Sequence, residues 1–471
     1  MPAVSPRSLP PSHAVTRRRP APLAWAAALC LGLALAPSAR AQSLQELYEA
    51  ARGYDASYLS SRALLDSAQY RVNQANALRL PSVGLGVSGS RSTTDTPASS
   101  TLNTSTNAVG ATLSGKQSLF NRANGVTISQ AQKSLEVSAA DFEAAEQDLI
   151  VRVAQAYFDV LAAQDALATT RTSKAAISEQ LASAKRNFEV GTATITDTRE
   201  AQARFDLATA QEIATGNDLQ TKRIALDQLV GRSNVTPNQL AVPVALPATT
   251  PDNIDEWVTR ADTEHPLVRK ARLGFEVAQL ETDKAKAGHL PTVDLSASYT
   301  RGHASTNGDA RFTTGAGSIV QGFNASGANN SSAIAVTLNV PLFAGYAIQN
   351  RVKETVVLED KARFDLEAAR RGVAQGTRQA FFGVQSGRAQ VKAIEAAESS
   401  SQLALEATQL GYKVGVRVNL DVLNAQTQLF TTRRDLAKAR YDVLVGSLKL
   451  RQASGRLKPE DVNALNQLLA K

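Results

Sequence analysis

Cysteine and long apolar runs are both scarce in this 471-residue chain. The only cysteine, Cys30, lies in an N-terminal segment that we predict is removed, so disulfides and thiolate metal sites are excluded from the mature chain. After residue 41 no apolar run approaches the about 20 residues that a membrane-spanning helix needs. Three classes remain: a soluble periplasmic protein, a secreted protein, or a β-barrel, whose short alternating strands escape a hydropathy scan.

The first 41 residues carry the features of a secretory signal peptide. Three arginines at 17–19 precede an apolar stretch over 23–36, and an A-x-A cleavage site ends at Ala41. A membrane-spanning helix is disfavoured because Pro22 and Pro37 bound a run too short to cross about 30 Å of hydrocarbon. We therefore predict a signal peptide over 1–41 and an exported mature chain.

Most of the positive charge of the sequence belongs to that segment. It contains five arginines and no acidic residue, so its removal lowers the net charge from +8 to +3. A mature chain with a net charge this close to zero gives no indication of a nucleic-acid partner.

The remainder of the chain contains two copies of one unit. Short matches recur in the same order, which is the sequence signature of a repeated architecture. They include Leu80-Pro81 with Leu290-Pro291, Ala156-Tyr157-Phe158 with Ala380-Phe381-Phe382, Val190-Gly191 with Val414-Gly415, and Gly231-Arg232 with Gly455-Arg456. We predict a first repeat over 42–232, a linker or equatorial segment over 233–259, a second repeat over 260–456, and a C-terminal equatorial segment over 457–471.

Each repeat contains a pair of segments with a period of two, at about 82–119 and 292–342, which predicts β-hairpins. One face is apolar and the other is small and polar, as suits strands between lipid and a wet lumen. An ordinary sandwich edge is the alternative. The apolar positions are Val83, Leu85, Val87, Val109, Ala111 and Leu113 in the first copy and Val293, Leu295, Ala297, Tyr299, Ile334, Val336, Leu338 and Val340 in the second.

Four strands are too few to close a barrel, since the smallest transmembrane barrels use about eight. An open sheet in lipid would leave unpaired edge amides, at a cost of several kcal/mol each. If these strands lie in a membrane, several chains must share one barrel, and three chains would supply twelve strands.

A long helix without proline follows each hairpin, over 121–188 and 344–412, and each would reach on the order of 100 Å. Glycine turns near 191 and 415 predict that a second helix returns from each. Apolar residues spaced by seven predict a seam against a partner helix. They are Ile128, Leu135, Phe142 and Leu149, and Leu429, Leu436, Val443, Leu450 and Leu457. The fold class is therefore mainly α, with duplicated long helical hairpins and four strands per chain.

The two glycine turns resemble the hairpin tips of the TolC outer-membrane efflux family. The first is Asn187-Phe188-Glu189-Val190-Gly191 leading to Ile195-Thr196-Asp197, and the second is Tyr412-Lys413-Val414-Gly415-Val416-Arg417 leading to Asp421-Val422-Leu423-Asn424-Ala425. With the duplication, the resemblance covers nearly the whole mature chain. It implies a homotrimer with a twelve-stranded barrel in outer-membrane lipid and a twelve-helix tunnel in the periplasm.

The resemblance also implies partners and site residues. A periplasmic adaptor (membrane fusion) protein and an inner-membrane RND or ABC transporter would engage the tips at Val190, Gly191, Val414 and Gly415. Links between hairpins would hold the entrance shut: Asp197 with Tyr412, Arg417 with the Thr196 region, and Asp421 as an acidic ring. The family archetype has a second aspartate where this chain has Asn424, so the ring would be less negative and cation block weaker.

Signals for other functions lack their required context. Gly84-Leu85-Gly86-Val87-Ser88-Gly89 matches G-x-G-x-x-G but lies within a predicted strand, so a dinucleotide site is disfavoured. His265 and His289 lie beside prolines or turns and His303 in a predicted loop, a spacing that indicates no metal site. We expect no enzyme activity and no cofactor. A passive export channel for small molecules or proteins is favoured. A dedicated type I secretion component is one alternative, and a coiled-coil surface protein or adhesin is the other.

Overall fold

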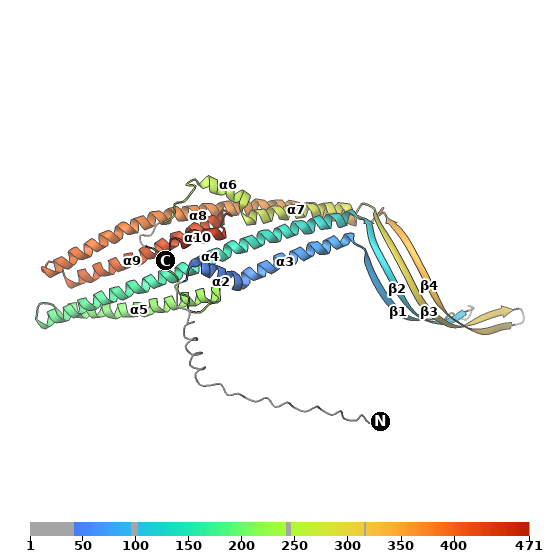
Figure 1. Cartoon of the computed structure of the whole chain (residues 1–471), viewed down its shortest axis with the longest axis horizontal. Helices are drawn as coiled ribbons and strands as arrows, with labels where there is room; N and C mark the ends of the chain where they lie inside the picture. Colours follow the sequence, from blue (N-terminus) through green and yellow to red (C-terminus); the bar gives the residue numbers. More distant parts are fainter. Residues whose placement is uncertain (1–41, 96–101, 242–245, 315–316, 471) are drawn as a thin grey trace, which may run out of the picture.

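The computed structural model describes residues 42–95, 102–241, 246–314 and 317–470, and the predicted signal peptide lies outside these ranges. Long helices run side by side, and a four-stranded sheet lies at one end (Figure 1). The first repeat contains α2 (Leu44–Tyr54), α3 (Ala56–Asn76), η1 (Ala77–Arg79), β1 (Ser82–Thr94), β2 (Leu102–Phe120), α4 (Arg122–Glu189) and α5 (Ile195–Val230). The second contains α6 (Ile254–Glu264), α7 (Pro266–Ala287), β3 (Thr292–Thr314), β4 (Gly317–Asn339), α8 (Ala347–Lys413), α9 (Asn419–Ala453) and α10 (Pro459–Asn466).

The predicted helical hairpins are confirmed as α4 with α5 and α8 with α9. At about 1.5 Å per residue, the 68 residues of α4 and the 67 of α8 each extend roughly 100 Å. Such lengths are stable only when packed, and each long helix packs along its returning partner. Within the described ranges, no helix combines the length and the apolarity needed to cross a membrane.

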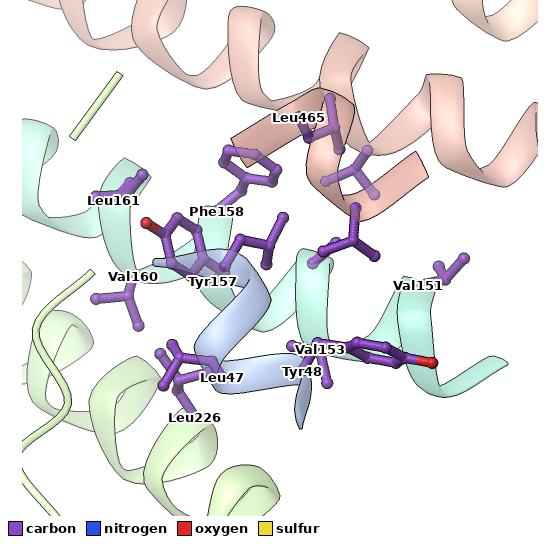
Figure 2. Close-up of a cluster of buried hydrophobic side chains, with 14 of the residues drawn as sticks. Leu47, Tyr48, Val151, Val153, Tyr157, Phe158, Val160, Leu161, Leu226 and Leu465 are labelled. Carbon is purple, nitrogen blue, oxygen red and sulfur yellow. The ribbon is translucent and has the colours of Figure 1, made fainter. Parts of the chain in front are cut away.

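The largest apolar core lies where α4 meets short helices from both ends of the chain. Tyr157 and Phe158 of α4 are fully buried, and Leu47 of α2, Leu226 of α5 and Leu465 of α10 pack in the same cluster (Figure 2). The Tyr157 hydroxyl donates to the Asn238 carbonyl oxygen at 2.9 Å, which satisfies the polar tip of this buried ring. This core joins the middle of the helical hairpins to the segments outside them.

The two predicted equatorial segments, 233–259 and 457–471, contact each other. Leu240 forms an antiparallel bridge with Leu469, and Gln42 forms a parallel bridge with Pro237. Leu457, the last residue of the second heptad series, lies after the end of α9 and after Gly455, which has a positive φ of 73°. Its side chain is buried in the same core as α10, so the heptad series within α9 ends at Leu450.

The four strands form one antiparallel sheet in the order β1-β2-β3-β4, which leaves β1 and β4 as edges. Leu85 of β1 pairs with Leu113 of β2, and Leu295 of β3 pairs with Val336 of β4, so the predicted apolar positions face each other across both hairpins. Leu85 is 72% exposed and Val336 is 64% exposed in the single chain. Water would not favour such a face, whereas lipid would.

The polar stretch between the apolar parts of β3 and β4 is strand rather than loop. His303, which we expected in a loop, lies within β3 opposite Val109 and Ala328. The pairing of β3 with β4 continues from Thr292–Asn339 to Thr314–Gly317 without a bulge. Backbone pairing satisfies the amides there whatever the side chains are, and for this reason the side-chain pattern understated the strand length.

Candidate functional site: the tips of the helical hairpins

The first tip is closed by a glycine turn and a capped helix. Gly191 has a φ of 79°, and the N–H of Thr192 donates to the Asn187 carbonyl oxygen at 2.8 Å, which ends α4. At the start of α5, Asp197 Oδ2 accepts hydrogen bonds from the N–H of Thr194 at 3.0 Å and from its hydroxyl at 2.7 Å. This capping box occupies Asp197 within its own turn.

The second tip repeats the turn with a different charge arrangement. Gly415 has a φ of 82°, and α9 begins after Val418 without a side-chain cap. Arg417 Nη1 lies 3.5 Å from Asp421 Oδ2 in the first turn of α9. A Cβ at Gly411 would lie 2.7 Å from Arg417 Cγ, so this glycine allows the arginine stem to fold back on α8. The Asp421 carboxylate therefore has a positive side chain beside it.

Side-chain hydrogen bonds join the first hairpin to the second near the tips. Asn187 Nδ2 of α4 donates to the Tyr412 hydroxyl of α8 at 3.2 Å. Arg204 Nη2 of α5 donates to Asn424 Oδ1 of α9 at 3.0 Å. The second bond has a charged donor, and such bonds contribute more than neutral ones. Both hold the hairpins of one protomer together.

A small apolar layer lies behind these bonds. Leu423 of α9 is 1% exposed and packs with Ile177, Leu181 and Ala184 of α4 and Ala201 of α5. Gln180 of α4 also hydrogen-bonds Asn419 of α9 at the edge of this layer. The contact between the hairpins therefore combines a dry centre with a polar rim.

The structure brings together only some of the residues that we assigned to a gate. Within the described residues, Asp197 and Tyr412 do not bond each other, because Thr194 and Asn187 are their respective partners. Arg417, in the turn before α9, pairs with Asp421 in the first turn of α9, while Thr196 is exposed. Links between neighbouring protomers lie beyond a single chain.

Asn187, Arg204 and Gln180 complete the contact, and the sequence alone does not assign any of them to it. Helical periodicity carries no information on which residues meet across helices more than 200 positions apart. The duplication offers one usable signal: Tyr412 stands where the first copy has Phe188, so the second copy adds a hydroxyl at this level. That hydroxyl is the one that accepts the Asn187 bond.

The turns themselves present exposed apolar side chains. Val190 is 73% exposed at the first tip, and Val414 and Val416 are 65% and 75% exposed at the second. Gly191 and Gly415, with nothing within 4 Å of a built Cβ, add open backbone next to them. Exposed apolar residues grouped at one end of a molecule are typical of a contact surface.

Farther from the tips, a partly buried polar pair joins α4 to α9. The Tyr441 hydroxyl donates to Asp165 Oδ2 at 2.7 Å, and the Tyr441 ring stacks on Phe158 with centroids 5.8 Å apart. Burial raises the pKa of the Asp165 carboxyl, and the bond from Tyr441 opposes that rise. Burial, together with this carboxylate, also raises the pKa of the Tyr441 phenol. This pair lies between the tips and the core around Tyr157.

Long paired helices with contact tips at one end and an apolar-faced partial sheet at the other define a channel protomer, which needs further copies to close. The family model for outer membrane efflux proteins matches residues 47–232 and 257–456, and the chain belongs to that family. Its family is one of channel proteins rather than enzymes.

Individual relatives agree with this assignment. The outer membrane protein TolC of Vibrio cholerae is 33% identical over 90% of this chain and 93% of its own length. The alkaline protease secretion protein AprF of Pseudomonas aeruginosa is 30% identical over 68% of this chain and 64% of its own length. Among solved structures, the outer membrane protein VceC of Vibrio cholerae has a TM-score of 0.71 at 20% identity, covering 88% of this chain and 96% of that one, which supports the fold.

The chain is thus an outer-membrane channel-tunnel for efflux and secretion that works with partner pumps. Its strands lie in the outer membrane, and its helices form a tunnel in the periplasm. Channels of this family are trimers, and this accounts for the two unpaired sheet edges: β4 of one protomer can pair with β1 of the next.

Proposed function

We propose that the protomer forms a homotrimer whose helical tips are a gate, opened when a periplasmic adaptor docks on them and joins the channel to an inner-membrane RND or ABC transporter. The observation that carries this proposal is the contact between the two hairpins of one protomer, with its small dry centre and three side-chain hydrogen bonds at the rim. A few such bonds, at about 0.5–3 kcal/mol each, can hold a hairpin closed and still yield to a docked protein.

The docking surface in this proposal consists of Val190, Gly191, Val414 and Gly415. Their exposure supports the role, since an adaptor would bury apolar side chains that now face water. The positive φ of each glycine keeps the turn tight, and the valine beside it is exposed in that turn.

The gate in this proposal comprises Thr196, Asp197, Tyr412, Arg417, Asp421 and Asn424, joined by Asn187 and Arg204. Within one protomer, Tyr412 and Asn424 hold the hairpins together. Between protomers, the exposed Arg417 and Thr196 are available to a neighbouring chain, and Arg417 would exchange its 3.5 Å contact with Asp421 for that partner.

Three Asp421 carboxylates would line the constriction. Each has Arg417 beside it, and the neutral Asn424 accepts a bond from Arg204, so positive side chains lie close to the ring. We expect weaker block by divalent cations than a ring of six carboxylates would give, because fewer negative charges attract the cation.

Single-channel recording in planar bilayers tests the gate. The double variant Tyr412→Phe with Arg417→Glu removes the acceptor of the Asn187 bond and reverses a charge at the constriction. We expect a higher conductance than that of the unsubstituted channel. A conductance that does not change would count against a gate at these residues.

Protein secretion is the second candidate function, favoured by the likeness to a relative named for the secretion of an alkaline protease. Deletion of the gene, followed by profiling of both drug susceptibility and secreted proteins, separates the two cargoes. Sensitisation to drugs with an unchanged set of secreted proteins would contradict a dedicated type I role. The opposite result would contradict drug efflux.

A further inference from the structure

The outer end of the β3–β4 hairpin differs in character from the part near the helices. In Figure 1, β3 and β4 project beyond the end of the β1–β2 hairpin. The cross-strand register runs through this region without a shift, so each residue can be assigned to one of the two sheet faces by its parity.

Near the helices, the outward face is the apolar one. Leu295 of β3 and its partner Val336 of β4 share that face, and the lumen face carries Ser296 and Ala335. The outward face is therefore formed by odd-numbered residues of β3 and even-numbered residues of β4. This is the orientation of a strand between lipid and water.

Toward the outer end, the polarity of the two faces inverts. The outward face carries Asp309 and Arg311 of β3 and Asn324 of β4, with Val320 as its one larger apolar residue. The lumen face carries Ile319 and Phe323 of β4. Beyond the lipid, the polar outward face is in contact with extracellular water. Contact with water does not account for the apolar side chains on the lumen face.

Phe323 is held in place on that lumen face by its cross-strand partner, Gly308 of β3. A Cβ at Gly308 would lie 2.8 Å from Phe323 Cε1 and 2.6 Å from the Asn103 carbonyl oxygen. The ring therefore lies directly over Gly308, and a larger residue there would displace it. Phe323 remains 37% exposed and Ile319 remains 61% exposed in the single chain.

We propose that Ile319 from three protomers meets on the threefold axis and that Phe323 lines the wall beside it, so that the two residues form an apolar constriction at the outer mouth of the barrel. The inference rests on the trimeric barrel. In a threefold barrel, every lumen face is turned toward the axis, so the surface opposite each Ile319 is the same surface of the two other copies. The occupant of this face is thus a second and a third copy of the same segment.

The dimensions permit this contact. Twelve strands spaced about 4.8 Å apart and tilted about 40° give a barrel radius of roughly 12 Å. Residues 317–326 of β4 span about 30 Å as a strand. The outer end of the hairpin is thus long enough to lean over the lumen and reach the axis.

Cysteine cross-linking in the complete channel tests the contact. The single native cysteine, Cys30, lies within the predicted signal peptide, so introduced thiols have no competitor in the mature chain. Under mild oxidation in intact cells, Ile319→Cys should give a disulfide-linked dimer of protomers on denaturing gels. Two controls should stay monomeric there: Val320→Cys, which is adjacent but on the outward face, and Ala333→Cys, which is on the lumen face but in the barrel wall.

The outcomes separate the contact from the trimer. An Ile319→Cys channel that is trimeric by native sizing but gives no linked dimer would overturn the constriction. Equal cross-linking of Val320→Cys would also overturn it, since the contact would then not be specific to the lumen face. A monomer for the unsubstituted channel would overturn the barrel itself, and with it the proposed function.

A conductance measurement provides an independent readout. In the Tyr412→Phe, Arg417→Glu background, Ile319→Ser with Phe323→Ser should raise the single-channel conductance further, while Val320→Ser should leave it unchanged. If the double serine variant conducts as its parent does, the outer mouth does not limit flow and the proposal fails.

Discussion

Replacing Arg204 with alanine tests whether the contact between the hairpins holds the entrance closed. In the structure, Arg204 Nη2 donates to Asn424 Oδ1 at 3.0 Å, and this is the one bond with a charged donor between α5 and α9 near the tips of the described chain. Arg204→Ala removes the donor and leaves the exposed Asn424 amide free to bond water. The closed state of the channel loses the stabilisation that this bond provides, whereas the open state, in which the hairpins are apart, is not affected.

The size of the effect follows from the type of bond. Hydrogen bonds to charged groups contribute about 1.5–3 kcal/mol, and neutral ones about 0.5–1.5 kcal/mol. Because Arg204 and Asn424 are near the surface, the lower part of the range applies. We therefore expect the closed-to-open ratio to fall roughly tenfold, since about 1.4 kcal/mol corresponds to a factor of ten. Tyr412→Phe, which removes a neutral bond of 3.2 Å, should have a smaller effect.

Open probability in planar bilayers is the appropriate measurement. Arg199→Ala is a matched control, because Arg199 lies on the same helix, is exposed, and makes no hydrogen bond or ion pair within the described residues. The reasoning predicts a rise for Arg204→Ala and none for Arg199→Ala. An equal rise in both would show that loss of positive charge, rather than loss of the bond, opens the channel.

Two further predictions concern stability. Gly455→Ala should lower the unfolding free energy by about 2–5 kcal/mol, because φ is 73° and the new Cβ would lie 2.5 Å from His265 Cα. The control is Gly372→Ala, where a Cβ has open space. Equal thermal stability of the two variants in detergent would contradict this prediction. Asp55→Asn should cost about 1–3 kcal/mol at neutral pH, because Arg152 donates two bonds to Asp55, at 2.9 and 3.0 Å. Those bonds lower the pKa of the Asp55 carboxyl in the folded chain. Its contribution to the unfolding free energy is therefore complete above the pKa of the unfolded chain, about 3.9, and is lost as the pH falls through the lower pKa of the folded chain. In the variant, the unfolding free energy should fall less steeply as the pH is lowered. A fall as steep as that of the unsubstituted protein would refute this.

Local patterns predicted the elements of the fold well. The apolar alternation at Val83–Leu85 and Val336–Leu338 identified strands because one face meets a different solvent from the other. The absence of proline over 121–188 and 344–412 identified the long helices. The number of strands also indicated several chains, since lipid leaves no edge amide unpaired.

Tertiary contacts and strand lengths could be predicted from the sequence less well. The bond between Arg204 and Asn424 joins residues 220 positions apart, and no local periodicity encodes it. Asp197 satisfies its own helix start, so its acidic character alone could not show whether it also reaches Tyr412. His303 lies in a strand because backbone pairing with β2 and β4 tolerates polar side chains on both faces.

The central claim is that four strands per chain must join those of sibling chains in a membrane. The most direct test is native mass spectrometry of the protein extracted from outer membranes in detergent. The account predicts a particle of three chains that requires detergent to stay in solution. A single chain that stays soluble without detergent and does not associate with the membrane would contradict it.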